Sequence, residues 1–232
     1  MAVEEIIVRQ PADLAPYVDD IVGVYDRAFR EPPYNHNAIA ADNFRGILPT
    51  HLTYPDFEAI LLYEAGRLLG FVYGHTNAPD QWWYRQIAPS LSSTVRRDVF
   101  DGAWVVVELA VDPAARRRGF GRQLLAATMD RKPNRWAVLT TMDADSAAVH
   151  LYAQAGFQPL LSQFVFPEGL GRWLVLARDL SSSSGAATNC QTGRSSGPNG
   201  SASPSSRPSS DQSVTDGSSS IRAGSLNGES QT

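Results

Sequence analysis

The residues best suited to chemistry form a turn with the sequence Arg-Arg-Arg-Gly-Phe-Gly at positions 116–121. Glycine at positions 119 and 121 lets the backbone turn tightly and lets a ligand approach it closely. The turn stands between a predicted buried strand and a predicted helix, whose first N–H groups carry a partial positive charge. Together with the arginine side chains at the rim, these groups favour an anion such as a pyrophosphate.

The same turn departs from two common nucleotide-binding patterns. It is not followed by the Gly-Lys-Ser/Thr of a P-loop, and Leu124 stands where the dinucleotide fingerprint needs its third glycine. Nucleotide binding is therefore the weaker interpretation of the turn, and competition by ATP would test it.

The apolar pattern predicts the elements that must position this turn. Strands are expected where apolar residues alternate or run continuously, at residues 6–9, 57–64, 68–75, 104–111, 136–142, 157–166 and 172–179. Helices are expected where apolar residues recur every three or four positions, at residues 11–29, 37–47, 119–130 and 146–155, the last capped by Asp145 or Ser146. The sequence thus predicts an α/β fold in the order strand, helix, helix, strand, strand, strand, helix, strand, helix, strand, strand.

Residues 76–103 lack a clear period, and connections of this length inside a compact domain are often functional. A serine at position 90, 92 or 93 could cap a short helix that runs through Arg97. The segment also carries three adjacent aromatic residues, Trp82, Trp83 and Tyr84. Their rings either pack the segment against the core or line a substrate pocket.

Composition divides the chain of 232 residues into two parts. Residues 181–232 contain 18 Ser and 7 Gly but no Phe, Tyr or Trp. Such a stretch has too little apolar surface to offset the entropy of ordering, so we expect a disordered tail. Residues 1–180 have the size of one domain with a core of its own.

Charge and residue usage exclude several classes of function. The tail is neutral, and residues 1–180 hold 17 basic and 21 acidic side chains, which disfavours nucleic-acid binding. The only cysteine, Cys190, lies in the tail, and the four histidines (36, 51, 75 and 150) lack metal-ligand spacing, so no metal site is expected. Because no signal peptide or long apolar run is present, we expect a cytoplasmic protein without membrane contact.

Two motifs make the interpretation of the glycine turn more specific. Arg116-x-x-Gly119-x-Gly121 follows the segment Glu-Leu-Ala-Val-Asp-Pro at 108–113, and about 25 residues later comes Asp145-x-x-Ala148-x-x-Leu-Tyr-x-x-x-Gly-Phe, which ends at residue 157. The pair resembles the acyl-CoA motif and the second motif of the GNAT N-acetyltransferase superfamily. Asp145 stands where that family commonly has Asn. The resemblance is strong over residues 104–160 and does not reach the tail.

The resemblance implies a mixed sheet of about seven strands that splays open after the strand at 104–111. Acetyl-CoA would lie in this opening as co-substrate, with its pantetheine along that strand and its pyrophosphate on the amides of residues 117–122. The implied acetyl-CoA-binding residues are Leu109, Ala110, Val111, Arg116, Arg117, Arg118, Gly119, Phe120, Gly121, Arg122, Asp145 and Ala148. The implied reaction is direct transfer of the acetyl group to a primary amine in a ternary complex.

This reaction needs a base for the amine and a proton or hydrogen bond for the leaving thiolate. Glu108 is the best candidate for the base, because apolar neighbours in its strand would raise its pKa; the alternative is an ion pair with an arginine. The resemblance places Tyr152 as the acid. Its alternative role is that of a core tyrosine, in the apolar stripe that its helix presents.

The acceptor amine is not specified by the sequence, and a polyamine, an amino sugar, an amino acid and a protein amine all stay open. Candidates for its binding site are Tyr34, Asp143 and the aromatic residues 82–84. Tyr34 could instead pack on the Pro32-Pro33 turn, which we favour, and Asp143 could instead cap the next helix. The alternative function is a non-catalytic acyl-CoA-binding or sensing module on the same fold. The sequence makes no prediction about oligomeric state.

Overall fold

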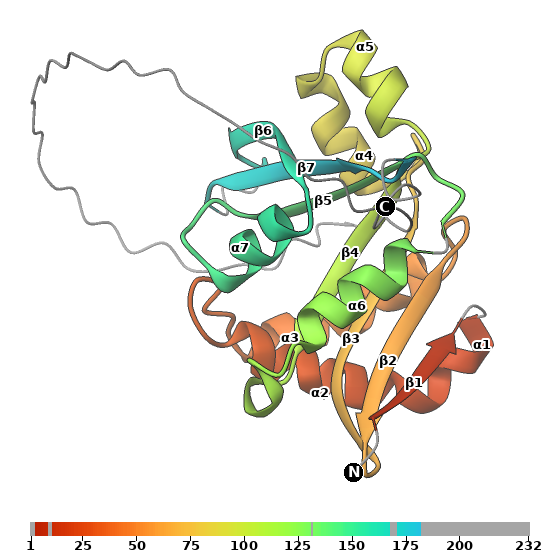
Figure 1. Ribbon diagram of the computed structural model, residues 1–232, viewed down its shortest axis with the longest axis vertical. Helices are drawn as coiled ribbons and strands as arrows, with labels where there is room; N and C mark the ends of the chain where they lie inside the picture. The colour runs from red at the N-terminus through yellow and green to blue at the C-terminus, as the bar shows by residue number, and fades with distance from the viewer. Residues whose placement is uncertain (1–2, 9–10, 131, 168–170, 182–232) are drawn as a thin grey trace, which may run out of the picture. The chain divides into compact units, whose positions relative to one another are not determined.

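The computed structural model describes residues 3–8, 11–130, 132–167 and 171–181. Within them a seven-stranded mixed sheet has the strand order β1-β2-β3-β4-β5-β7-β6 (Figure 1). Its strands are β1 (Val3–Val8), β2 (Glu58–Glu64), β3 (Arg67–Thr76), β4 (Trp104–Val111), β5 (Trp136–Met142), β6 (Gln158–Phe164) and β7 (Trp173–Asp179). All neighbouring pairs are antiparallel except β4 and β5. The predicted α/β fold with a mixed sheet is confirmed.

Helices cover both faces of this sheet (Figure 1). They are α1 (Pro11–Leu14), α2 (Val18–Phe29), α3 (Ala38–His51), α4 (Trp82–Ile87), α5 (Ser93–Val95), α6 (Phe120–Met129) and α7 (Ala147–Gln154). Helix α2 packs on β3 and β4 from one side, and α6 packs on β2, β3 and β4 from the other. The site residues of β4 therefore lie between two helical layers.

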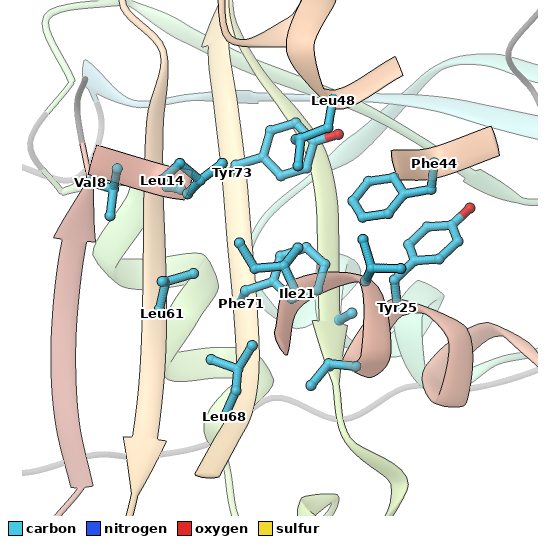
Figure 2. Close-up of a cluster of buried hydrophobic side chains, with 14 of the residues drawn as sticks. Val8, Leu14, Ile21, Tyr25, Phe44, Leu48, Leu61, Leu68, Phe71 and Tyr73 are labelled. Atoms are coloured by element: carbon cyan, nitrogen blue, oxygen red, sulfur yellow. The ribbon is translucent and has the colours of Figure 1, made fainter. Parts of the chain in front are cut away.

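One apolar cluster joins α1, α2 and α3 to the first strands of the sheet (Figure 2). Phe44 and Leu48 of α3 and Ile21 of α2 meet Phe71 and Tyr73 of β3. Each buried side chain of this size stabilises the fold by roughly 1.5–3 kcal/mol. A second cluster lies under α6 and α7, and a third joins α4 and residues 96–100 to β5 and β7.

A buried ion pair lies beside the sheet near the start of β4. Lys132 Nζ lies 2.7 Å from Glu58 Oε1 and 3.7 Å from the centre of the Trp104 ring. The side chains of Lys132 and Glu58 are only 7% and 6% exposed. The charge of the lysine is thus balanced by a carboxylate and by the face of an aromatic ring.

Strands β4 and β5 pair only at their beginnings. Trp104 pairs with Ala137 and Val105 with Val138, and no further pair follows. Residues 106–111 of β4 therefore have β3 on one side and no strand partner on the other, within the described residues. This is the splay that the family resemblance implies.

The structure differs from the sequence prediction in several places. The helix predicted over 37–47 continues to His51, and the strand predicted over 157–166 ends at Phe164. The helix predicted over 11–29 is divided by a 3-10 turn at Ala15–Tyr17, where Pro16 cannot donate an N–H to a helical hydrogen bond. The first strand begins at Val3 rather than Ile6. Residues 76–103 form α4, α5 and short turns rather than a mainly irregular connection. Residues 182–232 of the predicted tail lie outside the described residues.

Candidate active site

Glu108 lies at an irregularity of strand β4. It pairs with Tyr73 of β3, but the next residue of β3, Gly74, pairs with Val106, so Val107 is the extra residue of a bulge. A bulge re-aims the side chains beside it and commonly occurs next to active sites. Gly74 is required here, because a Cβ atom would stand 2.2 Å from the carbonyl oxygen of Val105.

The Glu108 carboxyl has no ion-pair partner among the described residues, and no hydrogen bond to it is found there. Its side chain is half-buried. Burial raises the pKa of Glu108 to about 8, because the charged form loses solvation that no cation replaces. The ion pair with arginine, the alternative left open by the sequence, is not seen in this part of the chain.

Four tyrosines lie near enough to this carboxyl for its charge to act on them. Burial raises the pKa of Tyr25, Tyr34, Tyr73 and Tyr152, and the charge of Glu108 adds to each shift. All four phenols are therefore protonated at neutral pH and can act as hydrogen-bond donors. The sequence analysis identified only Tyr34 and Tyr152 of this group, since Tyr25 and Tyr73 follow the ordinary apolar pattern of their helix and strand.

The hydroxyl of Tyr73 is engaged with a histidine. It lies 2.9 Å from Nδ1 of His51, at the end of α3. Burial lowers the pKa of His51 to about 3, so the imidazole is neutral at pH 7 and Nδ1 can accept this hydrogen bond. Tyr73 is thus held in place on one side of Glu108.

Tyr152 comes from helix α7. Ser146 begins this helix, since its Oγ accepts a hydrogen bond from the Val149 N–H at 3.3 Å. Tyr152 is 7% exposed and lies edge-on to Phe157, with 5.8 Å between ring centres. No hydrogen bond of its hydroxyl is found within the described residues. Tyr152 thus combines a packed ring, as the core interpretation expects, with a hydroxyl that is free to donate.

Tyr34 reaches the open edge of β5. Its hydroxyl lies 3.3 Å from Oγ1 of Thr141, and its ring packs edge-on against Phe29 at 4.8 Å. The neighbouring residue Thr140 points to the opposite face of the strand and accepts a hydrogen bond from Trp83 Nε1 at 3.3 Å. Tyr34 therefore contacts β5 and Phe29, and it lies near enough to the candidate base for that charge to act on it.

The other candidates for acceptor binding either pack within the fold or are exposed. Trp82 stacks on Phe166, with 5.6 Å between ring centres. Tyr84 donates a hydrogen bond to Asp101 at 2.7 Å and packs on Phe100. Asp143 follows β5 and is exposed, and Ser146 rather than Asp143 or Asp145 caps α7. Trp82 and Tyr84 thus pack against the rest of the fold, as one of the two interpretations of residues 82–84 expects.

The glycine turn precedes helix α6 as predicted. Gly119 begins the helix with φ +87°, a left-handed conformation that glycine adopts without strain. The N–H groups of Phe120, Gly121 and Arg122 belong to the first turn, where a helix has no internal acceptors. At Gly121 a Cβ atom would be in ordinary contact with Leu151, so the turn itself depends on Gly119.

The arginines of the turn have different partners. Arg118 makes two hydrogen bonds to the Glu64 carboxylate, at 2.7 and 3.1 Å. Arg116 contacts the Glu31 carboxylate, and Arg122 donates to Gln154 at 2.8 Å. Arg117 is exposed at φ +63°, and its guanidinium makes no hydrogen bond or ion pair with the described residues. Arg117 is therefore the arginine whose charge is least compensated by the protein.

The remaining predicted acetyl-CoA residues lie along the splay. Leu109 and Val111 are partly buried and pack on the cluster below α6, while Ala110 points to the opposite cluster and is buried. Ala148 belongs to the first turn of α7 and packs on the same cluster as Tyr152. Asp145 is exposed and lies 3.6 Å from His150 Nε2.

Asp112 is a structural residue that the sequence analysis did not identify. It is 1% exposed, accepts the Ala114 N–H at 2.9 Å, and pairs with Arg27 at 2.9 Å and Arg67 at 3.0 Å. These hydrogen bonds outweigh the effect of burial and hold the pKa of Asp112 below its ordinary value. Asp followed by Pro is a capping signal, but the two arginines come from distant elements and leave no local trace.

Comparison with known proteins agrees with this geometry. A sequence model of the acetyltransferase (GNAT) family matches residues 21–157, more than half of the chain. The chain therefore belongs to the GNAT acetyltransferase family. The resemblance inferred from the two motifs is thereby confirmed.

One curated relative is a GCN5-like protein acetyltransferase, Rv2170, from Mycobacterium tuberculosis. It is 26% identical over 122 residues, which are 49% of this chain and 59% of that protein. The chain thus matches less than two thirds of the length of this relative.

Solved structures share the fold. PaiA N-acetyltransferase from Thermoplasma acidophilum, in complex with coenzyme A, aligns with a TM-score of 0.54 at 11% identity, over 77% of this chain and 99% of that chain. A GNAT-family protein from Desulfovibrio desulfuricans gives 0.53 at 16% identity, over the same shares. These similarities support the fold assignment.

In residues 3–8, 11–130, 132–167 and 171–181, no group of three or more His, Cys, Asp or Glu side chains is placed to hold a metal ion. Among the helices of the same residues, none has the length and apolar character needed to cross a bilayer.

Proposed function

We propose that this protein transfers the acetyl group of acetyl-CoA directly to a primary amine, with Glu108 as the base. The observation that carries the proposal is the Glu108 carboxyl, which lies where β4 has separated from β5 and has no ion-pair partner among the described residues. Its pKa is raised, and its charge acts on four nearby phenols. A carboxyl with a pKa near 8 is a stronger base than an ordinary glutamate and is still partly ionised at neutral pH.

The residues around the splay suit acetyl-CoA as co-substrate. Beyond Val105 the backbone of β4 has no strand partner on the β5 side, so an extended amide-bearing chain such as pantetheine can lie along it. The first N–H groups of α6 and the uncompensated charge of Arg117 would receive the pyrophosphate. Leu109, Val111 and Ala148 would line the same path.

The reaction divides between two side chains. The ionised Glu108 carboxylate takes a proton from the ammonium of the acceptor, since a free alkylamine has a pKa of about 10.4. The amine nitrogen then attacks the thioester carbon, forming the C–N bond as the C–S bond breaks. The second proton that the nitrogen must lose passes to the leaving thiolate, which departs as free thiol. Tyr152 donates a hydrogen bond to the leaving sulfur, and because its pKa is raised, it stabilises the thiolate while keeping its own proton.

The acceptor is a small-molecule or protein amine. The name of the Mycobacterium relative, a protein acetyltransferase, supports a protein amine for this chain. Tyr34 is the side chain we propose for the acceptor wall, because it contacts Thr141 of β5 and lies near enough to Glu108 for that charge to act on its phenol. The single-domain boundary at residue 180, the cytoplasmic compartment and the absence of nucleic-acid and membrane partners stay predictions from the sequence.

Calorimetric titration with acetyl-CoA tests the proposal directly. We expect one binding site, and absence of binding at millimolar acetyl-CoA would refute the proposal. Release of free thiol is then followed over a panel that contains spermidine, glucosamine, free lysine and a lysine-containing peptide. Binding without thiol release from any amine would instead favour the non-catalytic acyl-CoA module.

A further inference from the structure

The segment between α2 and α3, residues 30–37, carries Tyr34 to the candidate site. It folds back on the end of α2, because the Asn35 N–H donates to the Glu31 carbonyl at 3.2 Å and the His36 N–H donates to the Phe29 carbonyl at 2.9 Å. Tyr34 then meets Thr141 of β5. The position of Tyr34 therefore depends on how firmly residues 28–36 are held.

Arg116 holds the beginning of this segment. Its guanidinium contacts the Glu31 carboxylate and also donates to the Ala28 carbonyl at 2.9 Å. Figure 1 shows the connection after α2 beside the loop that leads from β4 into α6. The planar guanidinium can serve both acceptors at once, which a lysine ammonium does with less fixed geometry.

We propose that Arg116 is a positioning residue. It couples the loop between β4 and α6, where acetyl-CoA is proposed to bind, to Tyr34 of the proposed acceptor wall. Its side chain faces Glu31 and Ala28, so its charge is already compensated by a carboxylate of the acceptor segment. Arg117, whose guanidinium has no hydrogen bond or ion pair with the described residues, supplies charge to the pyrophosphate. This inference rests on the proposed function, because it assigns the glycine turn to acetyl-CoA and Tyr34 to the acceptor.

The coupling follows from the chain connections. Arg116 lies three residues before Gly119, and Arg117 between them has a left-handed backbone. A pyrophosphate bound to the first N–H groups of α6 would restrict this short loop. The Arg116 guanidinium would then be held against Glu31 and Ala28, and residues 30–36 would be ordered before the acceptor arrives.

Hydrogen exchange tests this coupling without an acceptor. Asn35 and His36 report on the segment, since both amides are hydrogen-bonded within it. In the wild-type protein, we expect saturating acetyl-CoA to slow exchange of these amides about fivefold. In Glu31→Ala the slowing should disappear. Arg30→Gln is the matched control, because it removes the neighbouring pair with Asp26 and leaves Arg116 untouched.

If acetyl-CoA slows exchange of the Asn35 and His36 amides to the same degree in Glu31→Ala and in Arg30→Gln, the coupling is overturned. Binding of acetyl-CoA without transfer to any amine would refute the proposed function while the exchange experiment still decides on Arg116. The two proposals therefore fail separately.

Kinetics provide the second test. With the best amine of the panel, Glu31→Ala should raise the acceptor KM about fivefold and leave the KM for acetyl-CoA within about twofold, a split that a general loss of stability does not produce. Arg116→Lys should show an intermediate rise in acceptor KM. An equal rise in both KM values in Glu31→Ala would contradict the positioning role.

Discussion

Glu108 and Asp112 lie four residues apart along the same stretch of chain, yet their surroundings shift the pKa of the carboxyl in opposite directions. Asp112 receives two arginines and a backbone N–H, and these interactions lower its pKa. Glu108 receives no such partner from the described residues, and burial raises its pKa to about 8. One carboxyl is fixed in its charged form, and the other is poised to exchange a proton.

The difference shows how a structural carboxyl can be distinguished from a chemically active one on a short stretch of chain. Both side chains leave water, so burial alone does not distinguish them. The number of compensating donors does, because a paired carboxylate is stabilised and inert, whereas an unpaired one titrates near neutral pH. The following predictions test this contrast.

Replacing Glu108 by Gln should have the largest effect. Without the base, we expect kcat/KM for the amine to fall about 100–1,000-fold at pH 7.5. The loss should shrink as the pH approaches about 10.4, where the amine is already deprotonated. Initial rates between pH 7 and 10 measure this dependence, and a loss of equal size at every pH would remove Glu108 from the role of base.

The same variant should reveal the cost of the unpaired carboxyl. Because its pKa is higher in the folded state, Glu108 binds more protons folded than unfolded between about pH 4.5 and 8, so wild-type stability is lost as pH rises through this range. Glu108→Gln avoids this loss. We expect it to be more stable than wild type by on the order of 3 kcal/mol at pH 9 and equal at pH 4, as measured by urea unfolding.

Asp112→Asn should behave in the opposite way. It removes the charge that Arg27 and Arg67 share, and we expect a loss of about 2 kcal/mol at pH 7, limited because both arginines are half-exposed and stay solvated. The lowered pKa of Asp112 means that its contribution is lost as pH falls below about 4. Urea unfolding at pH 7 and pH 3 checks both statements; stabilisation at pH 7 would break the contrast with Glu108.

Tyr152→Phe tests whether the phenol serves the leaving group next to the base. We expect kcat to fall about tenfold, because one hydrogen bond to the developing thiolate is lost. The dissociation constant of acetyl-CoA should stay unchanged. Calorimetry and steady-state rates separate the two quantities, and an unchanged kcat would restrict Tyr152 to a packing role.

Deletion of residues 182–232 should have the smallest effect. All groups identified around Glu108 and Asp112 precede residue 182. The shortened protein should keep its melting temperature within about 2 °C and its affinity for acetyl-CoA within about twofold. A larger change in either would show that the environment of these carboxyls extends beyond the described residues.

Much of the fold could be predicted because the relevant signals are local. The hairpin turn at residues 65 and 66, the cap at Ser146 and the left-handed Gly119 are all determined by residues near them in sequence. Helix α4 was missed because six residues are too few to establish a helical period, and three of them are aromatic.

The site was predictable only where one strand or one loop forms it. Glu108 stands out as a charge within an apolar strand, and the glycine turn is contiguous. Tyr25, Tyr73 and the arginine partners of Asp112 reach the site from separate elements, and their spacing along the chain contains no sign of their meeting. Such convergence depends on strand order and register, which single-sequence patterns do not determine.

The buried pair of Lys132 and Glu58 has a practical consequence for studying transfer to proteins. Lys132 is the single lysine of the sequence, and its amine is enclosed by a carboxylate and an indole. Reagents that label lysine side chains will therefore mark an acceptor protein in a mixture and leave the lysine of this chain unmodified. Antibodies against acetyl-lysine can follow the reaction on the acceptor without a contribution from lysine acetylation of the enzyme itself.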